Sequence, residues 1–306
     1  MTAVSIVVIS KNEPALAQTL ERLAQQIDEA PAVVGDVELL VVDASTSNPM
    51  PRPNVRVPVS WIPFTPPRGV RVSIPHQRNA GVQAAKGDII VFTDCGCIPM
   101  DGWLERLLEP ILSGEERMVS GKTGALGELD PYDQLRRQQE STRYLPECPT
   151  INLAFRRDVF QELGGFDESF EYGSDVDFSW RAVHAGIRAR YAPDAVVLHD
   201  WGTRRRQLKR AFVYGKARAR LYNKHLIGRA GQSIRKRTFN ERDIVPLLYP
   251  LNLLGLPIAL RYRWYLLLPL ATLWRARENK PVATLVDHVA LGAGVLAGAW
   301  EIVNGK

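Results

Sequence analysis

The chain has 306 residues, of which 45% are hydrophobic and 24% are charged. This composition is ordinary for a globular protein, and the length suffices for one large domain or for a domain with an appendage. Three cysteines are too few for a disulfide framework in a chain of this size, which favours a reducing compartment.

The net charge of +6 is unevenly distributed along the chain. Residues 204–242 contain fourteen lysines and arginines against one acid, Glu241, so this segment carries +13 and the rest of the chain carries −7. A basic segment of this density favours phosphate-bearing partners, namely an anionic lipid surface, a lipid-linked substrate or nucleic acid. Nucleic acid is the least favoured, because no recognised nucleic-acid-reading motif accompanies the segment.

The amino-terminal part alternates between the patterns of strands and helices. The predicted elements, in chain order, are a strand at 4–9, a helix with apolar positions at Leu16, Leu20, Leu23 and Ile27, strands at 37–42 and 57–62, a helix that Pro75 opens, and a strand at 89–92. This alternation predicts a parallel, doubly wound α/β sheet. We expect no signal peptide, since the apolar run at residues 6–9 is short and no basic segment precedes it, so this part should stay in the cytosol.

The predicted strand at 89–92 ends at Asp94, a charge that a buried strand would avoid unless its end opens into a site. Ligands of open α/β sheets bind outside the carboxyl ends of the strands, where a carboxylate can hold a metal ion against a phosphate. The alternative is that Asp94 only caps the turn into a helix starting near Asp101. Cys95 and Cys97 form a lone pair without a second ligand pair, which indicates turn packing rather than a zinc site.

Two acids, Asp175 and Asp177, lie at the predicted start of a helix near Ser174, after a helix that Gly164 and Gly165 end. Ser174 and Asp177 have the spacing of a capping box, and both acids would favour a helix amino terminus. Asp177 also has Arg181 four residues on as a partner. Asp175 points the other way and lacks that partner, so we expect it to face a cleft.

The domain's last predicted strands, at 187–191 and 195–198, lead to His199. A lone histidine at a strand end is usually a satisfied polar residue. Its place at the end of the last strand also allows it to join Asp94 at a metal ion.

Taken together, the motifs resemble the family 2 inverting glycosyltransferases with a GT-A fold. The resemblance covers about residues 4–201 and rests on an ordered set of segments: SIVVISKNE, VVD ending at Asp43, RNAG from Arg78, GDIIVFTD, INLAFRRDVFQELGGFDE, SDVDFSWR and AVVLHD. It implies a GT-A type, mostly parallel sheet over residues 1–203, followed by a basic and apolar helical region over 204–306 that associates with the membrane.

The resemblance also implies roles for single residues. Asp43 matches the acid that contacts the nucleotide base, and Arg78 a basic position near the nucleotide. Asp94 matches the first acid of the D-x-D motif, which holds a divalent metal, Mg²⁺ or Mn²⁺, on the diphosphate. Asp175 matches the catalytic base, and His199 a histidine that helps to hold the metal. The donor would be a nucleotide sugar.

Three positions depart from the family pattern. Gly96 replaces the second D-x-D acid, Ser174 the Glu of the E-D motif, and Ala44 an acid that often follows Asp43. The loss at Gly96 affects metal affinity more than metal use, because Mg²⁺ commonly takes one or two carboxylates and completes its shell with water and phosphates.

The carboxyl-terminal third combines basic and apolar segments. The apolar stretches at 244–260, 264–274 and 282–300 are at or below the usual spanning length, and the first contains three prolines. We therefore expect interfacial or re-entrant contact with an anionic membrane surface, at the cytoplasmic face, over clean spans. Trp264, Tyr265 and Trp274, with arginines nearby, fit a belt at headgroup level. The acceptor would be lipid-linked or a growing surface glycan.

Two rival functions remain open. A polyprenyl-phosphate glycosyltransferase would use an acceptor phosphate that is already ionised and needs no base at Asp175. A non-catalytic nucleotide-sugar-binding subunit of a membrane assembly is suggested by Gly96 and Ser174.

Overall fold

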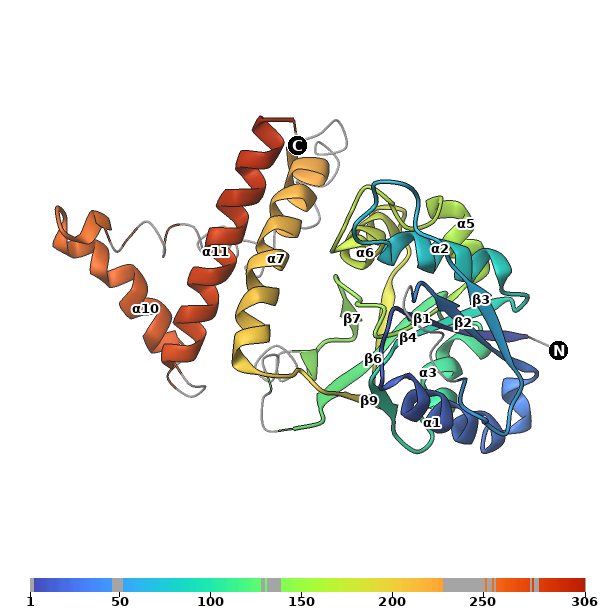
Figure 1. Ribbon diagram of the computed structural model, residues 1–306. Helices are drawn as coiled ribbons and strands as arrows, with labels where there is room; N and C mark the ends of the chain where they lie inside the picture. Colours follow the sequence, from blue (N-terminus) through green and yellow to red (C-terminus); the bar gives the residue numbers. More distant parts are fainter. Residues whose placement is uncertain are drawn as a thin grey trace. The chain divides into compact units, whose positions relative to one another are not determined.

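The computed structural model describes residues 3–45, 52–127, 130, 139–227, 251, 255, 257–275, 277 and 281–305. The chain divides into two compact units, Met1–Trp201 and Gly202–Lys306 (Figure 1). The sequence analysis placed this division after residue 203. Each unit is described by itself.

The first unit is built on one twisted, nine-stranded sheet with the order β3-β2-β1-β4-β8-β6-β9-β5, and β7 pairs with β9. Its strands are β1 (Val4–Ser10), β2 (Val37–Asp43), β3 (Val59–Pro63), β4 (Ile89–Asp94), β5 (Cys97–Pro99), β6 (Met118–Ala125), β7 (Tyr144–Leu145), β8 (Asn152–Arg156) and β9 (Ala189–His199). The four strands β3, β2, β1 and β4 are parallel, which confirms the doubly wound α/β class.

Beyond β4 the sheet is mixed. The strand β8 runs antiparallel to both β4 and β6, whereas β6 and β9 are parallel to each other. The sequence predicted two short strands at 187–191 and 195–198, but the structure has the single strand β9. Its pairing with β6 shifts register between Gly121 and Lys122, and this irregularity interrupts the apolar pattern without ending the strand.

Helices cover both faces of this sheet (Figure 1). They are α1 (Leu16–Asp28), α2 (Ile74–Ala84), α3 (Trp103–Leu112), α5 (Arg157–Leu163) and α6 (Ser174–His184), with a short 3₁₀ turn η1 at Ala32–Val34. The core on one face joins Ile6 and Val8 of β1 to α1 and α3, and the core on the other joins Val7 to α2, α5 and α6. Successive side chains of a strand point to opposite faces, so β1 serves both cores.

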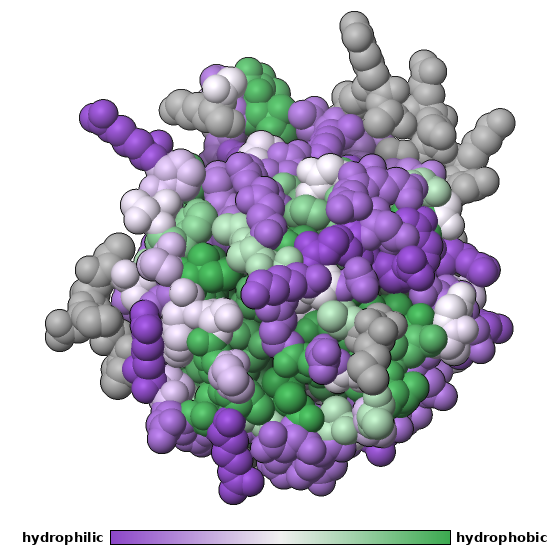
Figure 2. Space-filling model, turned by 90° about the vertical axis from the view of Figure 1, so that its right-hand side faces the viewer, coloured by the Kyte–Doolittle hydropathy of each residue, from purple (hydrophilic) through white to green (hydrophobic). Residues whose placement is uncertain are grey.

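The surface of the molecule seen in Figure 2 is mixed. Hydrophilic side chains dominate the upper half of this view, and hydrophobic ones gather in its lower half. Single apolar side chains at a surface, such as Val33 of η1, are normal for a soluble domain.

The second unit is helical. It contains α7 (Arg204–Tyr222), the π-helical turn η2 (Asn223–Ile227), the 3₁₀ turn η3 (Arg263–Leu266), α10 (Leu267–Arg275) and α11 (Pro281–Val303). Most of the apolar stretch predicted at 244–260 lies outside the described residues, which include only 251, 255 and 257–260 of it. The sequence predicted that the third apolar stretch, 282–300, is at or below the usual length for spanning a bilayer. This prediction is wrong, because the helix α11 extends the stretch to 23 residues. By length and composition this helix could cross a bilayer, for which about 20 residues suffice.

Candidate functional site

Two of the expected site residues, Asp43 and Asp94, lie at the ends of the strands on either side of β1. In the register of the sheet, Asp43 at the end of β2 pairs with Ser10 of β1, and Asp94 at the end of β4 pairs with Ile9 on the other side of β1. Strands in a sheet lie about 4.8 Å apart, so the backbones of these two acids are about 10 Å apart across one strand. Both acids therefore reach the edge where α/β sheets bind ligands.

Asp94 is half-buried and closely surrounded by protein. Burial raises its pKa, the charge of Arg78 lowers it, and the charge of Asp175 raises it. Three sequence-distant groups thus act on one another at this strand end. Asp94 does not cap α3, because the N-cap of that helix is Gly102 and no side chain caps it.

The Arg78 guanidinium, from α2, reaches the start of α6. It donates a hydrogen bond to the Ser174 hydroxyl (2.8 Å), and its Nη2 lies 3.8 Å from Oδ2 of Asp175. The ring of Phe166 lies 5.5 Å from the guanidinium carbon. The side chain is almost fully buried, yet its Nε has no hydrogen-bond partner among the described residues. A buried cation with a donor to spare suits an anionic ligand such as a diphosphate.

Asp175 and Asp177 differ as the sequence suggested. The Asp177 side chain is fully buried and lies 2.8 Å from Nε of Arg181, which confirms that pair. Asp175 keeps 19% of its side-chain surface exposed. Arg181 pairs with Asp177 and not with Asp175, whereas Arg78, which is remote in sequence, faces Asp175.

The predicted capping box does not form. Gly173, with φ of 82°, is the N-cap of α6, and no side chain caps the helix. Ser174 is already helical, and its hydroxyl accepts the bond from Arg78 instead. Ser174, which replaces the Glu of the family's E-D motif, is therefore hydrogen-bonded to Arg78, and Arg78 faces Asp175.

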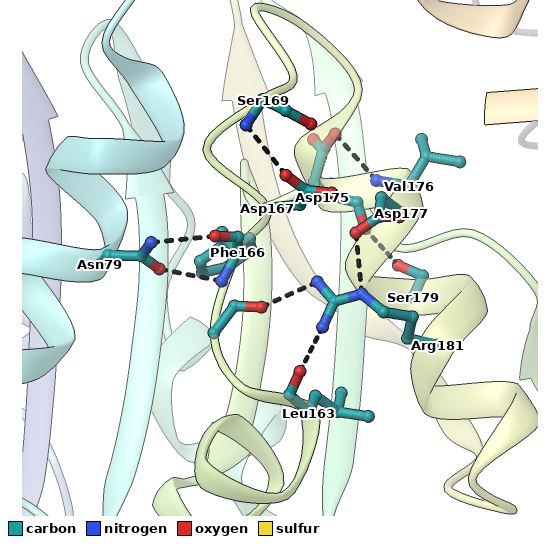
Figure 3. Close-up of polar contacts among 11 residues, drawn as sticks. Asn79, Leu163, Phe166, Asp167, Ser169, Asp175, Val176, Asp177, Ser179 and Arg181 are labelled. Atoms are coloured by element: carbon teal, nitrogen blue, oxygen red, sulfur yellow. Dashed lines mark hydrogen bonds and ion pairs between the residues drawn. The ribbon is translucent and has the colours of Figure 1, made fainter. Parts of the chain in front are cut away.

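The loop before α6 is held at two points (Figure 3). The Asn79 amide donates to the Phe166 carbonyl and accepts from the Phe166 amide, both at 2.9 Å. Arg181 donates to the carbonyls of Leu163 (2.5 Å) and Gly165 (2.8 Å). The loop turns at Gly164 and Gly165, whose φ values of 73° and 81° are ones that glycine adopts most easily. These contacts fix where α6 begins, and with it Asp175.

At the other end of the site, Asp43 organises a turn. Its Oδ1 accepts hydrogen bonds from the amide (3.1 Å) and the hydroxyl (2.5 Å) of Ser45. The Ser45 hydroxyl accepts in turn from the Asn12 amide (2.8 Å), and Asn12 has a φ of 55°. The bond from Asn12 to Ser45 joins the turns after β1 and β2 beside Asp43. Positive φ values such as that of Asn12 are uncommon outside glycine and cluster at functional sites.

His199 ends β9 in register with Cys97 of β5, and its ring lies 4.5 Å from that of Trp201. Across the residues that the structure describes, no group of three His, Cys, Asp or Glu side chains forms a metal cage. Asp94 still offers the carboxylate oxygen that Mg²⁺ and Mn²⁺ prefer, and these ions complete their shells with phosphate oxygens and water. The donor set fits an ion that binds together with a nucleotide, and the part of His199 remains a prediction.

A cavity of about 490 Å³ lies elsewhere, at the amino end of β4, and is lined by residues that include Asp88, Arg156 and Arg157. The Arg157 guanidinium there already donates to the carbonyls of Val82, Ala85 and Gly87. This arginine has a structural task, so we assign no function to the cavity.

The sequence did not predict that Asn79 and Phe166 hold the loop before α6, or that Ser174 binds Arg78. The RNAG and GGFD segments that contain Asn79 and Phe166 were nevertheless recognised as motifs. Their contact could not be read from the sequence, since Asn79 and Phe166 are 87 positions apart.

The family model of glycosyl transferase family 2 matches residues 5–164, and that of glycosyl transferase family group 2 matches residues 134–297. The chain belongs to glycosyl transferase family 2. The first match ends before Asp175 and His199, so their roles rest on the geometry and on the resemblance.

Among curated relatives, this family 2 chain is 33% identical to the pre-mycofactocin glycosyltransferase of Mycobacterium tuberculosis over 162 residues, which are 48% of this chain and 34% of the relative. It is 30% identical to glycosyltransferase AglE of Haloferax volcanii over 154 residues, 47% of this chain and 50% of the relative. The chain thus spans between a third and a half of the length of these two relatives.

Two solved structures share the fold. The mannosyltransferase PcManGT from Pyrobaculum calidifontis, in complex with GDP-Man and Mn²⁺, superposes with a TM-score of 0.63 at 20% identity, over 99% of this chain and 87% of that one. GalNAc-T7, with UDP, GalNAc and Mn²⁺, gives a TM-score of 0.51 at 15% identity, over 78% of this chain and 56% of that one. The GT-A fold expected for this family 2 chain is confirmed.

Proposed function

We propose that this chain transfers a sugar from a nucleotide-sugar donor to an acceptor hydroxyl, with inversion at the anomeric carbon. The observation that carries this is the meeting of Asp94, Arg78 and Asp175 at the carboxyl ends of the parallel strands. Family membership supports it, as do the GDP-Man bound to one solved neighbour and the UDP and GalNAc bound to the other.

Each residue of the site has a place in this reaction. Asp43 would accept hydrogen bonds from the nucleotide base, and the spare donor of Arg78 would hold the diphosphate. Asp94, with His199 as a second ligand, would hold Mg²⁺ or Mn²⁺, which neutralises the charge that develops on the leaving diphosphate. Asp175 would take the proton from the acceptor hydroxyl as it attacks from the face opposite the leaving group.

The second unit supports the proposed acceptor and location. Its apolar helices and basic α7 support an acceptor that is lipid-linked or a surface glycan, and a place on the cytoplasmic, anionic face of the cell membrane. The proposed partners do not include nucleic acid.

The test is the substitution Asp175→Asn in the full chain. Loss of the base should lower transfer by about 10²–10⁴-fold and leave nucleotide affinity unchanged. Nucleoside diphosphate release from a panel of nucleotide sugars, with Mn²⁺ or Mg²⁺, measures the first, and calorimetry the second. Glu171→Gln, which alters an exposed acid of the same loop, should retain activity.

Two results would contradict the proposal. Full transfer by the Asp175→Asn protein would favour an acceptor that is already ionised, such as a polyprenyl phosphate. Absence of transfer and of hydrolysis with every donor, despite nucleotide binding, would favour a non-catalytic subunit.

A further inference from the structure

The helices α7 and α11 of the second unit pack backbone against backbone (Figure 1). A Cβ on Gly215 of α7 would collide with the Leu291 carbonyl, and one on Gly294 of α11 would collide with the Phe212 carbonyl. A Cβ on Gly298 would lie 2.8 Å from the Lys216 carbonyl. The two helices can approach this closely only because glycine stands at these positions, so they form one body.

Ion pairs join the same two helices near both of their ends. Arg204 lies 2.7 Å from Asp287, near the start of each helix. Lys216 lies 2.5 Å from Glu301, and Arg220 3.6 Å from it, near the other end. The helices are therefore parallel, and α11 cannot move without α7.

The charge of α7 decides where this pair can lie. Its nineteen residues include eight lysines and arginines. If α11 crossed a bilayer, α7 would be carried into the hydrocarbon with these cations, where charged side chains are rarely tolerated. Asp287 and Glu301 are also only about 21 Å apart along α11, less than the ~30 Å hydrocarbon thickness, so an upright helix would bury at least one ion pair in lipid.

The opposite side of α11 carries its large apolar residues. At 100° per residue, the exposed large apolar side chains of α11 fall on one face of the helix, away from the glycines that contact α7. They are Val282, Val286, Leu296, Trp300 and Val303. These exposed side chains are spread along the length of the helix. A helix with one apolar face, held to a cationic neighbour on the other, matches the requirements of a membrane interface.

A second apolar face lies on α10 and η3. Leu267, Leu270 and Trp274 share one side of the helix, and Trp264 precedes them, all more than half exposed. Arg261 and Arg263 are exposed just before this face. Tryptophan between acyl chains and headgroups, with arginine beside anionic lipid, is the complement of an anionic membrane surface.

We propose that the second unit binds an anionic membrane from one side, with α11 lying along the interface instead of crossing the bilayer. The occupant of both apolar faces is then the same leaflet of lipid. This inference rests on the membrane partner of the proposed function, and it adds the orientation and the residues that make the contact.

The test for orientation uses the full chain added to sealed, preformed vesicles of phosphatidylcholine and phosphatidylglycerol. Arg277→Cys and Asn304→Cys replace exposed polar residues just before and just after α11, outside its apolar face, and the unsubstituted chain reports the background of its three native thiols. A membrane-impermeant maleimide added outside should label both positions, with no further labelling after detergent. Protection of either position until detergent is added would overturn the inference and leave membrane association standing.

The test for the contact is vesicle flotation. The double substitution of Trp264 and Trp274 by Ser should weaken binding about tenfold, whereas Val33→Ser, which removes an exposed apolar residue of the first unit, should not. Substitution of Arg261 and Arg263 by Gln should weaken binding roughly fivefold per arginine on anionic vesicles and leave binding to pure phosphatidylcholine unchanged. Equal loss on both lipids would overturn the role of anionic lipid, and failure of the unsubstituted chain to float at all would overturn the proposed membrane partner, while glycosyl transfer is measured separately.

Discussion

Arginine does different work in the two units. In the first unit Arg157 and Arg181 each bond to at least two backbone carbonyls, and Arg78 lies buried between a hydroxyl, a carboxylate and an aromatic ring. In the second unit Arg205 and Arg206 are exposed on α7. Arginine is thus a structural link at these three positions of the first unit, as it is at Arg204 between α7 and α11, and a surface charge at Arg205 and Arg206. The number of arginines in a unit therefore does not predict its stability.

The largest expected difference is at Arg181. Arg181→Met would leave the fully buried Asp177 carboxylate without its guanidinium, and breaking a buried pair in this way costs about 3–5 kcal/mol. The urea midpoint of the first unit should fall accordingly. Adding Asp177→Asn to this variant should recover part of the loss, because the uncompensated charge is gone; no recovery would contradict the explanation.

A smaller loss is expected at Arg157. Arg157→Met removes the donors to three carbonyls of the segment before β4, and unsatisfied buried groups cost about 1–3 kcal/mol each, so a total of about 2–4 kcal/mol is expected for a partly buried site. Thermal unfolding measures it. An unchanged melting temperature would show that water replaces the guanidinium.

The pKa values of two acids, one in each unit, are shifted in opposite directions, so the two acids should lose their charge in different pH ranges. Burial raises the pKa of Asp94, whereas the hydrogen bond from Lys216 lowers the pKa of Glu301. Lowering the pH should protonate Asp94 before an ordinary aspartate, so Mn²⁺-dependent nucleotide affinity should begin to fall at a higher pH than an exposed carboxylate would cause, by up to about tenfold per pH unit. The stability that Glu301 contributes is present above its unfolded pKa and should be lost only as the pH falls through its lowered folded pKa. Calorimetry across the acid range tests the first statement, and an affinity that does not depend on pH would contradict the role of Asp94.

The smallest effect is expected at Arg205. Arg205→Ala alters an exposed charge of α7 and should change the free energy of unfolding by no more than about 0.5 kcal/mol. A loss of unfolding free energy as large as that of the Arg157 variant would show that an exposed arginine of α7 contributes as much to stability as Arg157 does in the first unit.

Local patterns in the sequence were enough for some of these features. The apolar run before Asp94 predicted a central strand, and the four-residue spacing of Asp177 and Arg181 separated a paired acid from an accessible one. Contacts between distant segments left no such pattern. The bond from Arg78 to Ser174 joins residues 96 positions apart, and nothing in the local sequence near Ser174 excluded the capping box.

The antiparallel strand β8 illustrates the same limit for the fold. This strand spans Asn152–Arg156, and the first four of its residues are buried. A run of apolar residues carries no information on direction, because strands buried on both faces have the same composition in either orientation. The mixed half of the sheet therefore required coordinates.

Arg78 and Asn79 are consecutive on α2, and one faces the acid of α6 while the other grips the peptide of Phe166 in the preceding loop. The position of Asp175 therefore depends on contacts with α2 as well as on its own helix, α6. A rigid displacement of α2 would carry guanidinium, loop and carboxylate together, and the spacing within this trio would survive. Engineering that reshapes the pocket by shifting α2 as a block should consequently alter which donor fits before it alters how fast the bound donor reacts.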